Sequence, residues 1–283
     1  MSQFQDTTDL THLSELGEVT ADQLIARVEV LIRKSPTNAD LRWALFQWLC
    51  IVQSWDRAVQ QLQVYAQLKG TDVPMVHVYR DLIRAERHRA RVIGGAAQPG
   101  FVFDDIAPWM RSMLEALALA AKAAWSASDD AREKAIEAAP HIAGHSSDCA
   151  FEWIADSDSR LGPVCEIITA GRYRWISMAD IGAWDVKPPV SLLDLIWAPC
   201  VVTLKDGTPM RGFMPARYPD SGHPADPDTF DLLLGRCTSW EESGRTLVRA
   251  SGRKTWITSA GDASVFELAN ATFGASGTVA GVH

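Results

Sequence analysis

The chain has few of the features that mark secreted, membrane-bound or metal-binding proteins. Its 283 residues include only five cysteines, an odd number, and no two of them form a CxxC pair. Disulfide frameworks and thiolate metal sites depend on such paired spacing. No apolar segment of signal-peptide type stands at the start of the sequence. We therefore expect a cytoplasmic protein with reduced thiols.

Long hydrophobic runs are also missing. The two longest, 113–125 and 192–204, are each interrupted by charged residues and fall short of the roughly 20 apolar residues that a membrane-spanning helix needs. Glycine-rich phosphate loops are absent too, because Gly94-Gly95 and Gly171 fit neither the Walker pattern nor the dinucleotide pattern. The sequence therefore predicts no membrane partner and no cofactor, and we find no catalytic constellation.

The chain also has too little positive charge for nonspecific binding to nucleic acid. Its formal charge is −8, and residues 1–159 carry 15 Lys and Arg against 22 Asp and Glu. Nucleic-acid binding needs a basic footprint, so we expect no nucleic-acid partner. One basic cluster interrupts the acidic half. A solvated helix face is its simpler explanation, and a specific binding role is the alternative. The cluster consists of Arg84, Arg87, Arg89 and Arg91.

What the sequence does contain is a helical hairpin, around which the rest is organised. Apolar residues in 39–68 recur at the spacing of one buried helix face, interrupted by a turn at 53–56. An amphipathic helix at 21–33 precedes it and ends before Pro36. A helix ending in proline and then a helix pair is the layout of tetratricopeptide-type repeats. One and a half repeats do not form a solenoid alone, so another part of the chain must cover them.

Further helices follow the hairpin. Thr20 is the expected N-cap of the first helix, and Gly70 the expected C-terminal cap of the hairpin. Proline at a first helical position predicts a helix from Pro74 to about Val92. Two alanine-rich helices are expected beyond it, one over 109–125 after Pro108 and one from Asp129 or Asp130 to Pro140.

After His145 the pattern changes to short apolar runs with frequent glycine and proline, which favours strands. A strand at 200–204, the turn Lys205-Asp206-Gly207 and a return over 210–216 predict a hairpin. A short helix or turn is expected at 192–197. The other predicted strands are 173–176, 232–234, 245–250, 254–258 and 265–268.

The predicted fold class is therefore α+β, with two main parts. An all-helical tetratricopeptide-like domain is expected over 20–145, followed by a smaller, mainly antiparallel α+β domain over 146–273. A flexible N-terminus and linker at 1–19 and a disordered tail at 274–283 complete the prediction.

Two places have residue types that could carry chemistry. His141, His145 and Cys149, with Asp148, are the residue types of a metal site. Pro140 and Gly144 interrupt the helix that would align the two imidazoles, so an interdomain loop is the better interpretation and no metal is predicted. Cys237 has no nearby base to activate it as a nucleophile, which favours a buried or turn cysteine.

Eleven tryptophans are the more informative feature. Most are expected in the core or between domains. Helix pairs of this type commonly offer an apolar groove to a partner helix, where an exposed tryptophan acts as an anchor. The candidate partner-binding residues are Arg42, Phe46, Trp48 and Trp55, and packing of the pair against its neighbours explains each of them equally well.

A set of motifs is ordered along the chain from about residue 20 to residue 270. Its segments are 41–50, 55–58, 61–62, 174–176, 193–199, 212–219, 234–236, Thr238, Trp240 and 252–254. This ordered set resembles the ImpE/TagJ (SciE-type) accessory proteins of bacterial type VI secretion, with Ser54 in place of the glycine-like residue expected before Trp55.

This resemblance implies a non-catalytic cytoplasmic adaptor. Such proteins bind the N-terminal helix of the small contractile-sheath subunit, and so influence sheath assembly or its disassembly by the ClpV-type ATPase. Two other interpretations remain open from the residues alone. One is an enzyme with an unrecognised active site in the C-terminal α+β domain, and the other is a generic tetratricopeptide co-chaperone. The co-chaperone would need a clamp of Lys and Asn, where the hairpin has only Arg42 and Arg57.

Overall fold

The structure is a computed structural model that describes residues 20–70, 73–219 and 229–274. The predicted flexible N-terminus at 1–19 and all but Gly274 of the predicted tail lie outside these residues. In the described part, helices come first and strands follow, which confirms the α+β prediction and the mainly antiparallel C-terminal region. Within the described residues, no helix is both long and apolar enough to cross a bilayer.

The first four helices begin and end where local signals predicted. Helix α1 (Ala21–Lys34) starts with a capping box in which Thr20 and Gln23 satisfy each other's backbone N–H groups. Helices α2 (Ala39–Ile51) and α3 (Trp55–Lys69) form the predicted hairpin, and Gly70 closes α3 in the left-handed conformation. Proline at the first position opens the long helix α4 (Pro74–Ile93).

The next two helices differ from the prediction at their junction. Helix α5 (Pro108–Ala120) stops well before Trp125, and α6 (Trp125–Ala138) begins at Trp125 rather than at Asp129 or Asp130. The chain reverses between them with Ala123 at a φ of 57°. Asp129 is instead a helix-interior residue that accepts hydrogen bonds from the backbone N–H groups of Arg245 and Thr246. A tertiary contact was therefore mistaken for a helix start.

A nine-stranded sheet forms the centre of the strand region, in the order β1-β6-β5-β9-β8-β7-β14-β2-β3. Among its described strand pairs, β1 with β6 is parallel and the others are antiparallel. The predicted hairpin at 200–216 is present as β8 and β9. The strands are β1 (Gly100–Phe101), β2 (Gly144–His145), β3 (Ala150–Phe151), β5 (Val164–Thr169), β6 (Arg172–Ser177), β7 (Ile181–Val186), β8 (Trp197–Leu204), β9 (Pro209–Pro215) and β14 (Asn270–Phe273).

Two smaller sheets complete the region. Strands β10 (Thr238–Ser243) and β11 (Leu247–Gly252) form a hairpin, and β12 (Thr255–Thr258) pairs with β13 (Gly261–Ser264) and β4 (Ile154–Asp156). Two predicted strands are wrong. Residues 232–234 belong to the short helix α7 (Phe230–Leu233) and the turn after it, and 265–268 form a turn. Both runs are too short for periodicity to separate helix, turn and strand.

The sheet is buried on both faces where the helices cover it. Along β5, Val164 and Ile168 pack in the cluster that contains the helices, whereas Cys165 and Ile167 pack in a second cluster between the nine-stranded and three-stranded sheets. This alternation follows from the two-residue period of a strand. Glu166 lies between Cys165 and Ile167 in sequence, on the face that is turned toward the helices.

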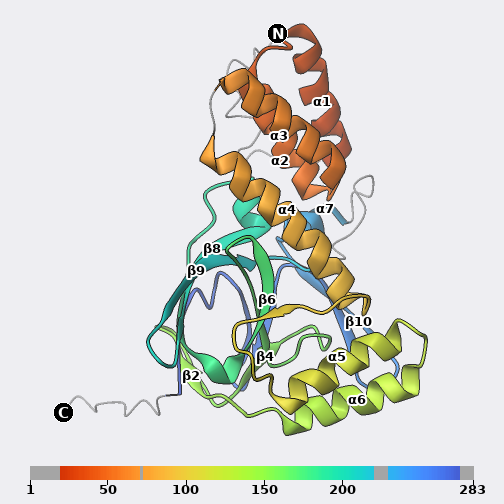
Figure 1. The fold of residues 1–283 in the computed structure, drawn as a ribbon, viewed down its shortest axis with the longest axis vertical. Coiled ribbons are helices and arrows are strands. Elements are labelled where there is room, and N and C mark those ends of the chain that lie inside the picture. The colour runs from red at the N-terminus through yellow and green to blue at the C-terminus, as the bar shows by residue number, and fades with distance from the viewer. Residues whose placement is uncertain (1–19, 71–72, 220–228, 275–283) are drawn as a thin grey trace, which may run out of the picture.

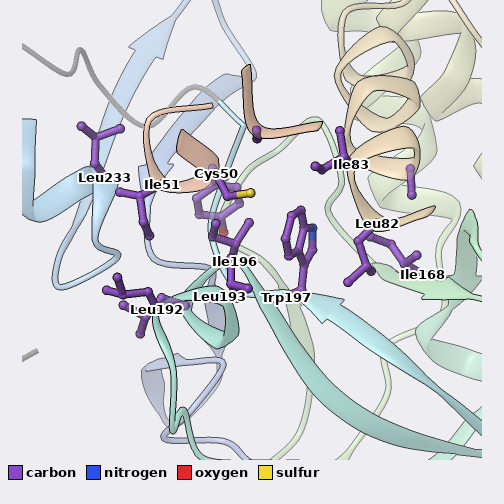
Figure 2. Close-up of a cluster of buried hydrophobic side chains, with 14 of the residues drawn as sticks. Cys50, Ile51, Leu82, Ile83, Ile168, Leu192, Leu193, Ile196, Trp197 and Leu233 are labelled. Carbon is purple, nitrogen blue, oxygen red and sulfur yellow. The ribbon is translucent and has the colours of Figure 1, made fainter. Parts of the chain in front are cut away.

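The helices lie in two groups, with α4 between them (Figure 1). Helices α1–α3 are at one end of the molecule and α5–α6 at the other, while α4 runs across the strands. Figure 2 shows the core where α2, α4 and the sheet meet. Cys50 and Ile51 at the end of α2 lie near Leu193 and Ile196. Leu193 belongs to the short 3-10 helix η4 (Leu192–Leu195), and Ile196 follows it directly. Trp197 points from β8 toward α4.

Candidate functional site

Beneath α4 lies a buried cluster of charged side chains centred on Glu166 of β5. Arg89 of α4 donates to both carboxylate oxygens of Glu166, Nε to Oε1 at 2.7 Å and Nη2 to Oε2 at 2.9 Å. Tyr173 donates to Oε1 at 2.6 Å, and Lys254 Nζ donates to Oε2 at 2.7 Å. Glu166 and Lys254 are fully buried. This bidentate Arg–carboxylate pair ties α4 to the sheet in one geometry.

The cluster continues across the strand region through Lys254. Its Nζ also donates to Asp156 Oδ2, and Tyr218 Oη donates to Asp156 Oδ1 at 2.6 Å. The Ser157 hydroxyl lies 3.0 Å from Tyr218 Oη and accepts a hydrogen bond from the indole of Trp240. Residues from β4, β5 and β10, the segment after β9 and the link between β11 and β12 are thereby connected.

In the other direction the cluster reaches α2. Arg89 Nη1 donates to the carbonyl of Arg217 at 3.0 Å, and Arg217 donates through Nη2 to the carbonyl of Cys50 at 3.0 Å. A cation next to the C-terminal carbonyls of a helix is favourable because of the helix dipole. Glu86 of α4 accepts a hydrogen bond from the indole of Trp197 at 3.2 Å. We call these connected residues the joint, because they connect α2 and α4 to the strands. The joint consists of Glu86, Arg89, Asp156, Ser157, Glu166, Tyr173, Trp197, Arg217, Tyr218, Trp240 and Lys254.

Burial and pairing act in opposite directions on the groups of the joint. Burial raises the pKa of Asp156 to about 6 although Lys254 lies beside it. Burial alone would raise the pKa of Glu166 as well, but Arg89 and Lys254 outweigh it and hold that pKa well below its usual range. Burial lowers the pKa of Arg217 to about 10. Glu166 is therefore an ionised carboxylate at the centre of the joint, whereas the carboxyl group of Asp156 titrates near pH 6.

Two of the four predicted partner-binding residues lie entirely inside the protein. Phe46 and Trp48 are both 0% exposed. Phe46 packs against Trp43 and Tyr79 with ring centroids 5.0 and 5.6 Å apart, and Trp48 stacks on Phe230 at 6.5 Å. They hold the hairpin against α4 and α7.

The other two predicted residues are partly exposed. Arg42 donates to Gln61 Oε1 at 3.0 Å and so connects α2 to α3. Trp55 opens α3, and its ring lies 5.9 Å from that of Trp197. Arg42 lies near the start of α2 and Trp55 just after its end, so the two are at opposite ends of the hairpin, and the structure does not gather all four residues on one surface.

The outer face of α4 lines a groove of about 780 Å³ whose opposite wall is β6. We call it the arginine groove, because six of its lining residues are arginines and none is acidic. Ile83, Ala85 and the ring of Tyr173 lie at its base. The arginines are Arg80, Arg84, Arg87 and Arg91 of α4 with Arg172 and Arg174 of β6; His88 also lines the groove.

The β5–β6 turn forms one end of the arginine groove and separates it from a second cavity of about 550 Å³. Ala170 and Gly171 in this turn have φ values of 48° and 68°, the left-handed region that two-residue hairpin turns require. A Cβ on Gly171 would lie 2.6 Å from Asp81 Oδ2. A side chain at residue 171 would therefore require the Asp81 side chain to move, and glycine lets the turn approach α4 without this shift.

The basic cluster seen in the sequence is divided by the fold. Arg84, Arg87 and Arg91 face the groove, as expected for an exposed helix face, but Arg89 is 1% exposed and belongs to the joint. The helical spacing could have predicted that Arg89 is buried. Residue 89 lies three positions from both Glu86 and Val92, on the buried face of the helix.

The possible metal ligands do not converge. His145 lies in β2, His141 is exposed before it, and Cys149 follows in a turn, where its backbone N–H and sulfur contact the Ser146 hydroxyl. No group of three or more metal-ligating side chains occurs among the residues that the structure describes. Sequence reasoning did not identify Glu166, Asp156 or Lys254, since their partners lie 77 to 98 positions away.

Three comparisons with known proteins agree with this architecture. Residues 148–272 match the family model described as ImpE protein. The type VI secretion system accessory component TagJ of Pseudomonas aeruginosa is 35% identical over 252 residues, which cover 89% of this chain and 87% of TagJ. The chain belongs to the ImpE/TagJ family. The crystal structure of protein VPA1032 from Vibrio parahaemolyticus has the same fold, with a TM-score of 0.82, 24% identity and coverage of 90% of this chain and 94% of that one.

The segments that carried the resemblance in the strand half supply much of the joint. Trp197, Arg217, Tyr218 and Lys254 all come from them, and each contacts another member of the joint. Trp175, from another of these segments, donates to Tyr173 Oη at 2.7 Å. In this half of the chain, several residues of the family motifs therefore belong to the joint, and Trp197 and Arg217 contact helices directly.

Proposed function

We propose that this protein is a non-catalytic cytoplasmic adaptor of a type VI secretion system. It binds the N-terminal helix of the small contractile-sheath subunit and so modulates sheath assembly, or sheath disassembly by the ClpV-type ATPase. The observation that carries the proposal is the 35% identity to a type VI secretion accessory component over 89% of the chain. Docking of an amphipathic helix on an apolar surface is a common mode of protein recognition.

The surface of the α2–α3 hairpin is the proposed contact. Arg42 and Trp55 are its accessible candidates, and Phe46 and Trp48 support it from the interior. Trp55 lies against Trp197, next to the joint. A partner helix at Trp55 would therefore lie at the boundary between the hairpin and the strands, next to residues of both regions.

A non-catalytic role is supported by the burial of the most perturbed carboxylates. Asp156 and Glu166 have strongly shifted pKa values, as catalytic groups often do. Both side chains are 0% exposed and bonded to Lys254, and a substrate must reach within hydrogen-bond distance of a catalytic acid or base. A co-chaperone clamp also has little support, because Arg42 contacts Gln61 and Arg57 pairs with Glu29.

A calorimetric titration with the N-terminal helix peptide of the small sheath subunit from the same organism tests the proposal. We expect saturable binding with a Kd in the micromolar range, about −8 kcal/mol. Arg42→Ala should weaken binding, while Arg27→Ala, an exposed arginine on α1, serves as the matched control. Absence of binding to both the peptide and the full-length subunit would contradict the adaptor function.

A further inference from the structure

We propose that the arginine groove binds an acidic helical segment of a protein partner. The groove borders the α2–α3 hairpin, since Val59 of α3 also lines it. The proposal concerns the arginines of α4 and β6 and stands whether or not the small sheath subunit binds the hairpin. It rests on the charge, the spacing and the missing counter-charge of the groove.

The charge of the groove is concentrated and only partly balanced. Within the described residues, Arg84 pairs with Asp81 at 2.8 Å and Arg87 with Asp56 at 2.7 Å, both at exposed positions. Arg80, Arg91 and Arg172 have no ion-pair partner among the residues that the structure describes. The whole chain has a charge of −8, so this concentration is a local feature.

The spacing of the arginines fits one face of a partner helix. Positions 80, 84, 87 and 91 follow each other at intervals of three and four residues, which aligns them along one side of α4. The stripe is about 16 Å long, at 1.5 Å per residue. A helix of about three turns with carboxylates at the same intervals could lie along it and place each carboxylate near a guanidinium, while Arg172 and Arg174 approach from β6.

The stripe is unfavourable for the isolated chain. Like charges three or four residues apart on a helix repel each other and destabilise it, and the four arginines form three such pairs along α4. Arg89 on the same helix is stabilised by Glu166. No comparable carboxylate lines the groove. A negatively charged occupant supplies the missing counter-charge.

An acidic protein segment fits the groove better than a nucleic acid does. Asp56 and Asp81 lie beside the stripe at exposed positions and would repel a phosphate backbone that extends beyond it. Nucleic-acid binding surfaces need a longer basic footprint. A short helix can instead place its acidic face on the stripe and keep its ends away from these carboxylates. The arginine groove is therefore matched to Glu-rich or Asp-rich helical segments of limited length.

The test uses the full chain and a synthetic 16-residue helical peptide with glutamates at positions 2, 6, 9 and 13, compared with the same peptide carrying glutamines there. We expect a Kd of about 0.1 mM or tighter for the glutamate peptide in low salt. The Kd should rise at least about tenfold between low salt and 0.3 M NaCl, because exposed ion pairs are screened. The glutamine peptide should bind at least about tenfold more weakly.

Two matched double variants locate the binding site. Arg80→Glu with Arg91→Glu should weaken binding of the glutamate peptide at least about tenfold. Arg27→Glu with Lys134→Glu reverses the same number of exposed charges on α1 and α6 and should leave the Kd within about twofold. Equal weakening by both double variants, no saturable binding of the glutamate peptide up to about 1 mM, or tighter binding of a single-stranded oligonucleotide would each overturn the proposal.

Discussion

Helix α4 places arginines in two opposite environments. On its inner face, Arg89 is buried, makes a bidentate contact with Glu166 and also pairs with Glu86. On its outer face, Arg80 and Arg91 are exposed and lack an ion-pair partner among the described residues. Arg91 lies only two residues after Arg89, so the direction in which a residue points from the helix decides which environment an arginine enters.

The difference separates residues that hold the fold from residues that are free to bind. A buried ion pair is costly to break, because removal of one partner leaves an uncompensated charge in the interior. Exposed arginines contribute little to stability, since water screens them. The same residue type on one helix should therefore give large effects on folding at position 89, and effects on binding at positions 80 and 91.

The largest expected effect comes from breaking the joint. Arg89→Met should lower the free energy of unfolding by about 3–5 kcal/mol, because Glu166 would keep its charge in the interior with Lys254 as its remaining cationic partner. Arg84→Met, an exposed arginine of the same helix, should change it by less than about 1 kcal/mol. Urea unfolding followed by tryptophan fluorescence measures both. Similar losses for the two variants would contradict the contrast between the faces.

A smaller effect is expected where the β5–β6 turn meets α4. Gly171→Ala should lower the free energy of unfolding by about 2 kcal/mol, because alanine at a φ of 68° is strained and its Cβ would push Asp81 away from the turn. Gly207→Ala has the same kind of backbone strain, at a φ of 86°, with no atom within 4 Å of the added Cβ. It should cost only about 1 kcal/mol. Equal costs would mean that the close approach to α4 contributes nothing.

Titration of Asp156 in the joint should make the free energy of unfolding depend on pH. The folded pKa of Asp156 is about 6, above the value of about 3.9 for an unfolded aspartate, so the folded state keeps a proton that the unfolded state releases. Wild-type stability relative to Asp156→Asn should therefore fall by about 1 kcal/mol from pH 5 to pH 7. Urea midpoints at both pH values measure it, with Asp148→Asn at an exposed position as control. A constant or rising difference would refute this assignment.

The smallest effect is expected at the groove. Arg80→Glu with Arg91→Glu should change the free energy of unfolding by less than about 1 kcal/mol. Two of the three repulsive pairs along the stripe become attractive, and this gain offsets the loss of the favourable interaction of Arg91 with the C-terminal end of the helix dipole. Thermal and urea unfolding measure this directly. A loss comparable to that of Arg89→Met would mean that the groove arginines hold the fold, and the contrast between the two faces of α4 would then disappear.

Most helices could be predicted because their signals are local. Thr20, Gly70 and Pro74 mark helix ends through their own hydrogen bonds and backbone angles. The start of α6 was misplaced because an aspartate can cap a helix or accept tertiary hydrogen bonds, and Asp129 does the second. The short helix α7 was mistaken for a strand, since four residues complete only one helical turn.

The site was less predictable because it is built from distant parts of the chain. Arg89, Glu166 and Lys254 meet only after α4 crosses the sheet, and nothing near Glu166 in sequence indicates a buried ion pair. The sequence indicated one wall of the arginine groove, as a basic cluster on one helix. Its second wall came from Arg172 and Arg174, whose place opposite α4 depends on the register of β5 and β6. The family motifs include Arg217, Tyr218 and Lys254 but not Arg89 or Glu166, and they did not indicate the ion pairs that these residues make.

Hydrogen exchange of the full chain, with and without the full-length small sheath subunit, tests the central claim of an adaptor most directly. We expect slower exchange in one contiguous region, the α2–α3 hairpin and its contact with η4 and β8, at saturating sheath subunit. Arg42→Ala should reduce this protection, and Arg27→Ala should leave it intact. Unchanged exchange throughout the chain under the same conditions would contradict the account.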